Sequence, residues 1–549
     1  MVMVNTTLKE MNAILRKSLS RKDYEELCLR YGIDLEGGGE YLNFDMSSDR
    51  VELSSKYSVA FLLGQLLGIK VHRSETVSSK SADITINSTY RPFVNVLYVK
   101  LDGRLGERMA DLLMIQEKLD KVAGRDRKLA AIGMFDYSMI KFPIKYLEVK
   151  MEDVSFAPLG SDEEKTYKQI LEDTEKGRQY GHLLDDKPIV WRQEDGKIFA
   201  LPPVINAGFA SLTEDTKSIL VDITGTDHDS VNSLTKALMF NLQFFGAVSV
   251  MKPKYSNANI TTNLKFKATS FVLSENEASR LLGVELSLKD IKSILSSLDY
   301  AVESAADGLA VTPPYYRQDI THQVDIVDDI MRVYGVDKIK ADDNRVYTSG
   351  KFLQNAQAIE LMRDVLIGFG YQELDLNIFT NEMYQFKKTG IDPSNYASFL
   401  GTKSAESTMA RLNITPEALR FVSNNLHKRF PQKLFDIGFV VSKADTDVDF
   451  ANKLRLCILS CGADTNISEI VVMLEKIINE AVGAGKVRLS DEKDLDGLSK
   501  MVIKGRGGVV YYGDVNIGAL GEVHPRVLNE FGIELPVAFA EIHLDGLGL

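Results

Sequence analysis

The chain has 549 residues, of which 65 are basic and 77 are acidic, so its formal charge at pH 7 is −12. At about 150 residues per domain this length predicts three to four domains and excludes a single small binding module. Hydrophobic residues make up 44% and charged residues 26%, which excludes a disordered, collagen-like or coiled-coil chain. Because the chain is acidic, any contact with nucleic acid requires a local basic patch or a partner chain.

The chain contains three cysteines, Cys28, Cys457 and Cys461, and no second pair completes a zinc site with the C-x3-C pair. We expect all three to be reduced residues of the core. No segment approaches the roughly 18 consecutive apolar residues of a membrane helix, and the first residues lack a basic region followed by a long apolar one. The sequence therefore predicts a cytosolic protein without membrane contact.

A pattern near the N-terminus returns with a constant offset of 267 residues. The first copy consists of Leu15, Leu19, Ser20, Lys22, Asp23 and Leu27, and the second of Leu282, Leu286, Ser287, Lys289, Asp290 and Ile294. In both copies a serine is followed three residues later by an aspartate, a capping-box variant that opens a helix. We expect two related small helical modules, although so short a pattern also arises by chance.

Four segments differ in their residue patterns. Residues 1–75 are predicted to form the N-terminal helical module, and residues 90–250, where β-rich runs alternate with helical stretches, an α+β domain. Residues 266–342 contain the second copy of the repeat, a proline turn and an acidic helix. Residues 350–549 begin with a helix and continue with long strands, which predicts a broad antiparallel sheet flanked by helices. The predicted fold class is therefore multidomain α+β.

One acidic cluster stands out, in the segment RQDITHQVDIVDDIMRVYG. If a helix begins near Asp325, then Asp325, Asp328 and Asp329 share one of its faces, and Asp319 can approach from the preceding loop. Four carboxylates suit a Mg2+ ion that keeps some of its waters. The alternative is helix capping, because negative charge near a helix N-terminus is favourable by about 0.3 to 1 kcal/mol per residue. The helix geometry leaves both interpretations open.

A second group of polar residues lies between Leu201 and Ser230, at predicted strand ends and turns: Asn206, Ser211, Thr213, Asp222, Thr224, Thr226 and Asp227. Such residues line pockets for polar small molecules, and they are equally ordinary at turns. The basic residues Arg125, Arg127 and Lys128 could contact phosphates or form a solvated face. Phosphate loops, dinucleotide-binding glycine motifs, zinc-protease motifs and nucleophile elbows are absent from the sequence.

The order of several segments resembles the β subunit of phenylalanyl-tRNA synthetase. RKLAAIGMFDYSMIK, FAPLG at 156–160, KGRQYGHLL at 176–184, LPPVIN at 201–206 and VDITGTD at 221–227 resemble its editing region. TPPYYRQDITHQVDIVDDIMRVYG is similar to its metal-binding module, and KLFDIGFVV at 433–441 to its synthetase-like domain. The resemblance covers nearly the whole chain from about residue 91. In its length the chain resembles the archaeal and eukaryotic cytosolic type of this subunit.

The resemblance implies a β subunit that lacks the aminoacylation site and works with an α subunit in an α2β2 heterotetramer on ATP, phenylalanine and tRNA(Phe). Residues 350–549 would be a class II synthetase-like domain without catalysis. Arg411 and Arg506 are isolated candidates for its ATP-binding arginines. The family's magnesium ligands fall on Asp319, Asp325, Asp328 and Asp329.

The resemblance also implies that residues 90–250 hydrolyse mischarged tyrosyl-tRNA(Phe). The candidate catalytic residues are Asp222, Thr224 and Ser211, and the candidate substrate-binding residues are Leu201, Asn206 and Thr226. One alternative is a structural and tRNA-binding subunit with an inactive pocket. Another, from a different class, is a free-standing magnesium-dependent hydrolase built on the aspartate cluster.

Overall fold

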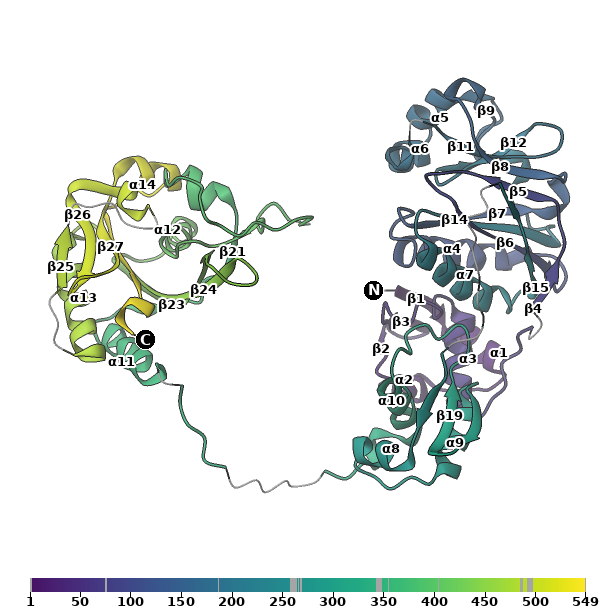
Figure 1. Cartoon of the computed structure of the whole chain (residues 1–549), viewed down its shortest axis with the longest axis horizontal. Coiled ribbons are helices and arrows are strands. Elements are labelled where there is room, and N and C mark those ends of the chain that lie inside the picture. Colours follow the sequence, from purple (N-terminus) through teal and green to yellow (C-terminus); the bar gives the residue numbers. More distant parts are fainter. Residues whose placement is uncertain are drawn as a thin grey trace. The chain divides into compact units, whose positions relative to one another are not determined.

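The structure is a computed structural model that describes residues 2–74, 77–185, 187–256, 264, 266, 269–341, 348–353, 355–402, 404–483, 487–490 and 497–548. It divides into two units, Met1–Asp343 and Asn344–Leu549, and each is described by itself (Figure 1). Residues 75, 342 and 549, at which three of the predicted domains end, lie outside the described residues. None of the described helices is both long enough and apolar enough to span a membrane.

The first unit contains two small modules whose elements follow the same order: strand, helix, helix, strand, strand (Figure 1). The N-terminal module consists of β1 (Val2–Thr7), α1 (Leu8–Leu15), α2 (Arg21–Tyr31), β2 (Asp34–Glu36) and β3 (Tyr41–Met46). The second module consists of β17 (Phe271–Leu273), α8 (Glu275–Leu282), α9 (Leu288–Ser297), β18 (Ala301–Ala305) and β19 (Gly308–Thr312). In each module the third strand lies between the other two in an antiparallel sheet.

Both modules begin a helix at the serine that the repeated pattern identifies. Ser20 accepts a hydrogen bond from the backbone N–H of Asp23 at the start of α2, and Ser287 accepts one from that of Asp290 at the start of α9. The predicted repeat is therefore confirmed. The prediction of small helical modules is corrected, because each module also contains a three-stranded sheet. These strands have three to six residues, too few for a clear alternating pattern.

Two further helices complete these modules. Val59 and Leu62 of α3 (Lys56–Leu67) pack in the core of the N-terminal module. Ile326 and Ile330 of α10 (Gln323–Tyr334) pack in the core of the second module. The Arg332 side chain of α10 donates a hydrogen bond to the backbone carbonyl of Tyr31 in α2, so the modules contact each other directly.

The middle of the first unit consists of two sheets packed face to face. The first sheet contains, in spatial order, β4 (Val77–Lys80), β15 (Gly246–Met251), β6 (Phe93–Leu101), β14 (Ser218–Gly225) and β7 (Ala130–Asp136). The second contains β13 (Ile205–Asn206), β12 (Ile198–Leu201), β11 (Ile189–Arg192), β8 (Ile144–Glu148), β5 (Ile84–Asn87) and β16 (Lys254–Tyr255). A small pair, β9 (Ser155–Phe156) and β10 (Lys165–Thr166), lies beside them.

Helices cover the outer faces of these two sheets (Figure 1). α4 (Met109–Val122) and α7 (His228–Leu242) pack on the first sheet, in a core that includes Val221 and Ile223 of β14. α5 (Tyr167–Asp173) and α6 (Glu175–Tyr180) pack on the second sheet. Because side chains alternate along a strand, Asp222 and Thr224 of β14 point the other way, toward the second sheet.

The second unit is built on one sheet with the order β20 (Gln372–Glu373), β23 (Gln432–Lys443), β24 (Phe450–Cys461), β28 (Val537–His543), β27 (Val515–Val523), β26 (Val502–Tyr512), β25 (Val487–Ser490). All neighbours are antiparallel except β20 and β23, which matches the broad antiparallel sheet predicted for this segment. A separate short pair is formed by β21 (Phe379–Thr380) and β22 (Met409–Ala410).

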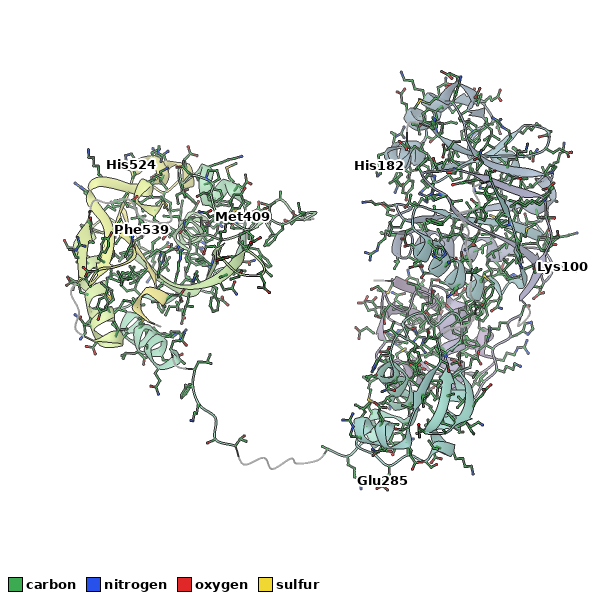
Figure 2. The ribbon with its side chains drawn as sticks, in the orientation of Figure 1. Lys100, His182, Glu285, Met409, His524 and Phe539 are labelled. Atoms are coloured by element: carbon green, nitrogen blue, oxygen red, sulfur yellow. The ribbon has the colours of Figure 1, made fainter. Side chains whose placement is uncertain are left out.

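Two layers of helices cover the sheet of the second unit. α11 (Ala356–Gly368) and α13 (Ile467–Val482) pack on one face. α12 (Thr415–Asn424) and α14 (Pro525–Phe531) pack on the other, where Met409 and Phe539 are fully buried (Figure 2). Cys457 and Cys461 of this sheet, like Cys28 in the N-terminal module, are buried and free, as the sequence predicts.

Candidate functional site

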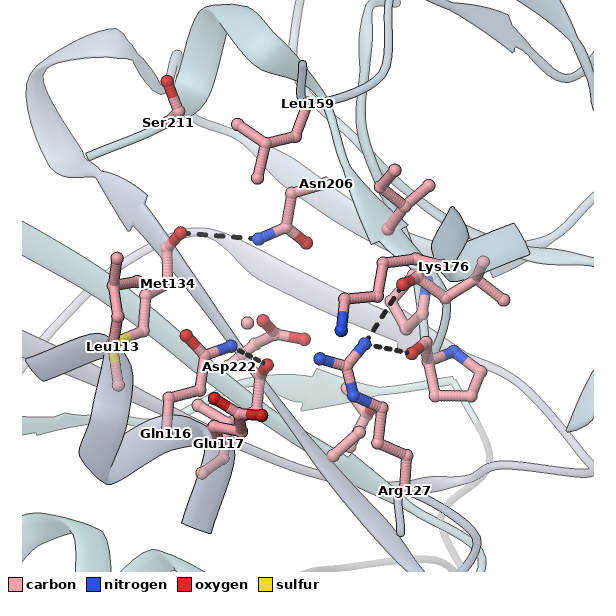
Figure 3. A pocket seen from close by; sticks show the side chains of 18 of the residues that line it. Leu113, Gln116, Glu117, Arg127, Met134, Leu159, Lys176, Asn206, Ser211 and Asp222 are labelled. Carbon is pink, nitrogen blue, oxygen red and sulfur yellow. Dashed lines mark hydrogen bonds between the residues drawn. The ribbon is translucent and has the colours of Figure 1, made fainter. Parts of the chain in front are cut away.

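A cavity of about 320 Å3 opens in the middle domain, lined by the edge strands β7 and β13 of the two sheets (Figure 3). Its other walls come from α4, from α6, from the segment of Pro202 to Val204, and from the inward-facing side of β14. The cavity is therefore assembled from segments that span more than 100 residues of sequence, between Met109 and Thr224.

Asp222 is the buried acid of this cavity. Its side chain is 3% exposed, and its Oδ2 atom accepts a hydrogen bond of 2.8 Å from the indole N–H of Trp191. Burial raises the pKa of Asp222 from 3.8 to about 7, while the Trp191 hydrogen bond opposes the rise. Near neutral pH the carboxyl group is therefore present in both protonation states.

Gly133 makes room for the Asp222 carboxyl group. The two residues lie opposite each other in the ladder between β7 and β14. A Cβ atom at position 133 would lie 2.0 Å from Oδ1 of Asp222, which no side chain can tolerate. Sequence reasoning missed Gly133 because a single glycine within a strand-like run gives only a weak signal. It also missed Trp191, whose contact with Asp222 joins two different sheets.

Side chains occupy the free edge of β7 where a further strand would otherwise pair. Nε2 of Gln116 donates to the carbonyl of Ile132 at 2.7 Å, and Oδ1 of Asp120 accepts from the backbone N–H of the same residue at 2.8 Å. Nδ2 of Asn206 donates to the carbonyl of Met134 at 3.5 Å. These contacts end the sheet and give the cavity a polar wall.

Asp120 is a second buried acid beside the cavity. Burial raises the pKa of Asp120 to about 6, and the nearby guanidinium of Arg127 opposes the rise. Nε of Arg127 lies 3.0 Å from Oδ2 of Asp120. For Arg127, Arg125 and Lys128 the sequence allowed either a phosphate contact or a solvated face. Arg127 lines the cavity, whereas Arg125 and Lys128 are exposed.

The structure brings four of the six predicted editing residues together: Asn206, Ser211, Asp222 and Thr224 line the cavity. Leu201 does not line it, because its side chain is fully buried in the core between β12 and α6. Thr226 is exposed beyond the end of β14, where its hydroxyl donates to the carbonyl of Lys128 at 3.3 Å.

The four aspartates of the predicted magnesium site are all engaged by other groups of the chain. Arg317 binds both Asp319, at 2.7 to 3.2 Å, and Asp329, whose Oδ2 also accepts a 2.6 Å hydrogen bond from the Tyr300 hydroxyl. Asp328 pairs with Arg332 at 2.7 Å, one turn further along α10.

Asp325 caps α10. Its carboxylate accepts hydrogen bonds of 2.8 Å from the backbone N–H groups of Thr321 and His322, so the capping interpretation applies to it. Within the described part of the chain, no group of three or more His, Cys, Asp or Glu residues is placed to hold a metal ion. The observed arrangement does not fit a Mg2+ ion, because the Arg317 guanidinium occupies carboxylate oxygens of both Asp319 and Asp329. The magnesium site remains a prediction from the sequence.

The second unit contains a buried polar network on its sheet. The Glu541 carboxylate accepts hydrogen bonds from the backbone N–H groups of Ile414 and Thr415 and from the Thr415 hydroxyl, at 2.7 to 3.0 Å, and pairs with Arg455 at 3.0 Å. Arg411 is buried and pairs with Asp436 at 2.9 Å.

Arg506, the other isolated arginine candidate, is exposed and pairs with Glu522 at 2.7 Å. Both arginines that sequence reasoning considered for ATP are therefore engaged within the chain and lie in different surroundings, one buried and one at the surface.

Two family matches place the chain among the subunits of tRNA synthetases. Residues 344–544 match the family described as "Phenylalanyl tRNA synthetase beta chain CLM domain", and residues 271–336 match the "tRNA synthetase B5 domain". The second match contains β17 to α10, that is, the second copy of the repeat and the aspartate cluster.

Relatives then define the particular family. The chain is 30% identical to "Phenylalanine--tRNA ligase beta subunit" of Pyrococcus horikoshii, over 98% of each chain, and 29% identical to the protein of that name from Methanocaldococcus jannaschii, over 99% of this chain and 100% of the other. A solved N-terminal fragment of the phenylalanyl-tRNA synthetase β subunit from P. horikoshii has a TM-score of 0.55 and 28% identity, covering 60% of this chain and 99% of the fragment. The chain belongs to the family of phenylalanine–tRNA ligase β subunits.

Proposed function

We propose that this chain acts with an α subunit in an α2β2 phenylalanine–tRNA ligase of the cytosol and that its cavity hydrolyses tyrosyl-tRNA(Phe). In this proposal the α subunit carries the ATP-dependent charging of tRNA(Phe) with phenylalanine. The middle domain, predicted as residues 90–250, is the editing domain. Family membership supports the role of β subunit, and the buried carboxyl group of Asp222 in the wall of the cavity carries the editing role.

The need for editing follows from the two amino acids. An apolar pocket shaped for one amino acid rejects a partner that adds a hydroxyl by only about 100-fold. A second site corrects the error if it binds the added hydroxyl itself. Asp222 suits this task because a buried carboxyl group pairs with the tyrosine hydroxyl, whereas phenylalanine would leave it without that partner. Trp191 and Gly133 keep the carboxyl group in place.

Hydrolysis in this cavity requires water at the ester carbonyl. A water oxygen forms a bond to the carbonyl carbon and gives up a proton, and the bond from that carbon to the ribose oxygen breaks. The ribose oxygen takes up the proton that the water has released, which gives free tyrosine and uncharged tRNA. Asn206 and Ser211 supply amide and hydroxyl groups that hold the substrate backbone or the terminal ribose. Orienting the ester and the water in one cavity supplies the rate enhancement.

The second unit serves as the assembly domain in this proposal, a class II synthetase-like fold without catalysis. Two buried ion pairs support this role: Arg411 pairs with Asp436, and Arg455 pairs with Glu541. Buried pairs of this kind are costly to break, since removing one partner leaves a buried charge uncompensated. These buried arginines therefore stabilise the fold of the second unit.

The test is hydrolysis of preformed tyrosyl-tRNA(Phe) by the full chain together with its α subunit, comparing the wild type with Asp222→Asn. The substitution keeps the size of the side chain and removes its ionisation. Asp229→Asn is the matched control, since Asp229 is an exposed aspartate of the same domain. We expect hydrolysis in the wild type and the control, and its loss in Asp222→Asn. Normal phenylalanylation without hydrolysis in any preparation would instead assign the chain a structural and tRNA-binding role.

A further inference from the structure

Two cationic side chains form one end of the cavity. The guanidinium of Arg127 and the ammonium of Lys176 both line it, and Figure 3 shows both reaching in from the side opposite Leu113. Both lie against the ring of Tyr180: Cζ of Arg127 is 4.4 Å and Nζ of Lys176 is 5.5 Å from the ring centroid. Cation–π attraction to this ring favours the close approach of the two like charges.

Arg127 is fixed in its position. Its Nη1 donates to the carbonyls of Pro203 at 3.0 Å and Val204 at 3.1 Å, and its Nε faces Asp120. No hydrogen bond to any residue that the structure describes uses its Nη2 atom, which is left for a ligand. The backbone that carries Arg127 is strained. Arg125, Asp126 and Arg127 have φ of 52°, 56° and 65°, in the left-handed region that such residues rarely adopt.

Lys176 has no acidic partner of its own. Within the described ranges of the chain, no carboxylate lies within ion-pair distance of its ammonium, although the side chain is half-buried. By contrast, Lys168, one helix earlier on α5, is exposed and pairs with Glu172 at 3.8 Å. A half-buried ammonium without a counter-ion, beside a guanidinium with an unused N–H group, is typical of a site for an anion.

The cavity also has an acidic part, formed by Asp222 and Glu117. A ligand that fills the whole cavity therefore carries an anionic group at one end and a hydrogen-bonding, uncharged or cationic group at the other. An aminoacylated tRNA end has this arrangement, because phosphodiesters precede the terminal nucleoside and the amino-acid ester follows it.

We propose that Lys176 and the free Nη2 of Arg127 bind a phosphodiester next to the terminal adenosine of the tRNA and so position the ester in the cavity. This inference rests on the proposed editing function. Lys176 is a positioning residue in this account, and it takes no part in the chemical step. Its contribution should appear with substrates that carry the phosphodiester and vanish with those that lack it.

The test compares two substrates, tyrosyl-tRNA(Phe) and tyrosyl-adenosine, which has the same ester and no phosphate. The complex of the full chain with its α subunit is used, with Lys176→Met as the variant, Lys176→Arg as the conservative variant and Lys168→Met as the matched control. Arg127 is left intact because it also holds the turn at Pro203. We expect Lys176→Met to lower kcat/KM for tyrosyl-tRNA(Phe) about tenfold, mainly through KM, as for loss of one charge-assisted contact.

Three further results are expected. Lys176→Met leaves hydrolysis of tyrosyl-adenosine unchanged, Lys176→Arg restores most of the activity on the tRNA substrate, and Lys168→Met behaves as the wild type. The slope of log kcat/KM against log salt concentration should fall by about 0.7 in Lys176→Met, the value for one phosphate contact on a single strand.

Equal losses on both substrates would overturn the inference, because the lysine would then act on the ester or on folding. No loss on either substrate, with an active wild type, would also overturn it while leaving the editing function intact. If the wild type hydrolyses neither substrate, the editing function itself fails, and the phosphate site fails with it.

Discussion

The Asp222→Asn substitution should make the middle domain more stable at alkaline pH while abolishing hydrolysis. The sign follows from the raised pKa of Asp222, which is about 7 in the folded protein against 3.8 ordinarily. Between these two values the unfolded chain has released the proton and the folded chain still holds it. The folded state therefore loses stability as pH rises through this interval, and the loss is complete above about pH 7.

The size of the effect follows from the same two values. At 1.36 kcal/mol per pKa unit, the penalty from Asp222 is about 2 kcal/mol near pH 5 and about 4 kcal/mol near pH 8. Asparagine does not ionise, so the stability of the variant relative to the wild type should rise by about 2 to 3 kcal/mol between these two pH values. Asp120 also titrates in this range in both proteins, so it contributes to the difference only through its charge coupling to Asp222.

The assay uses the one tryptophan of the chain, Trp191, whose indole donates to Asp222. Urea unfolding followed by its fluorescence reports on the first unit, which contains the middle domain, because the second unit has no tryptophan. In the folded wild type the fluorescence should titrate with a midpoint near the pKa of about 7, and this step should be missing in Asp222→Asn. An equal stability difference at both pH values, or the same titration in both proteins, would refute the account of the buried carboxyl group.

The remaining predictions concern the cavity, the repeat and the aspartate cluster. Gly133→Ala should abolish hydrolysis of tyrosyl-tRNA(Phe) and destabilise the middle domain by about 1 to 3 kcal/mol in urea, because its Cβ would displace the Asp222 carboxyl group. The control is Gly208→Ala, whose Cβ would have its nearest neighbour at 3.6 Å and which should behave as the wild type. Ser287→Ala should lower the unfolding free energy of its module by about 1 kcal/mol through loss of the cap on α9, and an unchanged melting curve would contradict the cap. Adding Mg2+ or EDTA should change the melting temperature little, because Arg317 already binds the carboxylates of both Asp319 and Asp329. A magnesium-dependent rise that Asp328→Asn removes would show that the metal site predicted from the sequence forms.

Local sequence signals predicted the local structure well. The two serine caps, the repeat between the two modules and the broad sheet of the second unit follow from spacing and alternation along short stretches of chain. These features depend on neighbours within a few residues, which the sequence displays directly. The strands of the two small modules were missed because they are short and their pattern is weak.

Contacts between distant segments could not be predicted in the same way. The period-2 alternation of β14 places Asp222 on an inward face, but the raised pKa depends on a second sheet that packs over it. Gly133 matters only because β7 pairs with β14 in one register. The aspartate cluster shows the opposite case. Its four carboxylates have suitable spacing, but Arg317, two residues before Asp319, binds both Asp319 and Asp329, while Arg332 binds Asp328.

The central claim is that this chain carries a site that selects tyrosine over phenylalanine by its hydroxyl group. The most direct measurement is the ratio of kcat/KM for hydrolysis of tyrosyl-tRNA(Phe) to that of phenylalanyl-tRNA(Phe) by the complex with the α subunit. The account predicts a ratio above about 100, because phenylalanine leaves a buried polar group unpaired. In Asp222→Ala, hydrolysis of tyrosyl-tRNA(Phe) should fall to the level of phenylalanyl-tRNA(Phe). Equal hydrolysis of both esters by the wild type would contradict it.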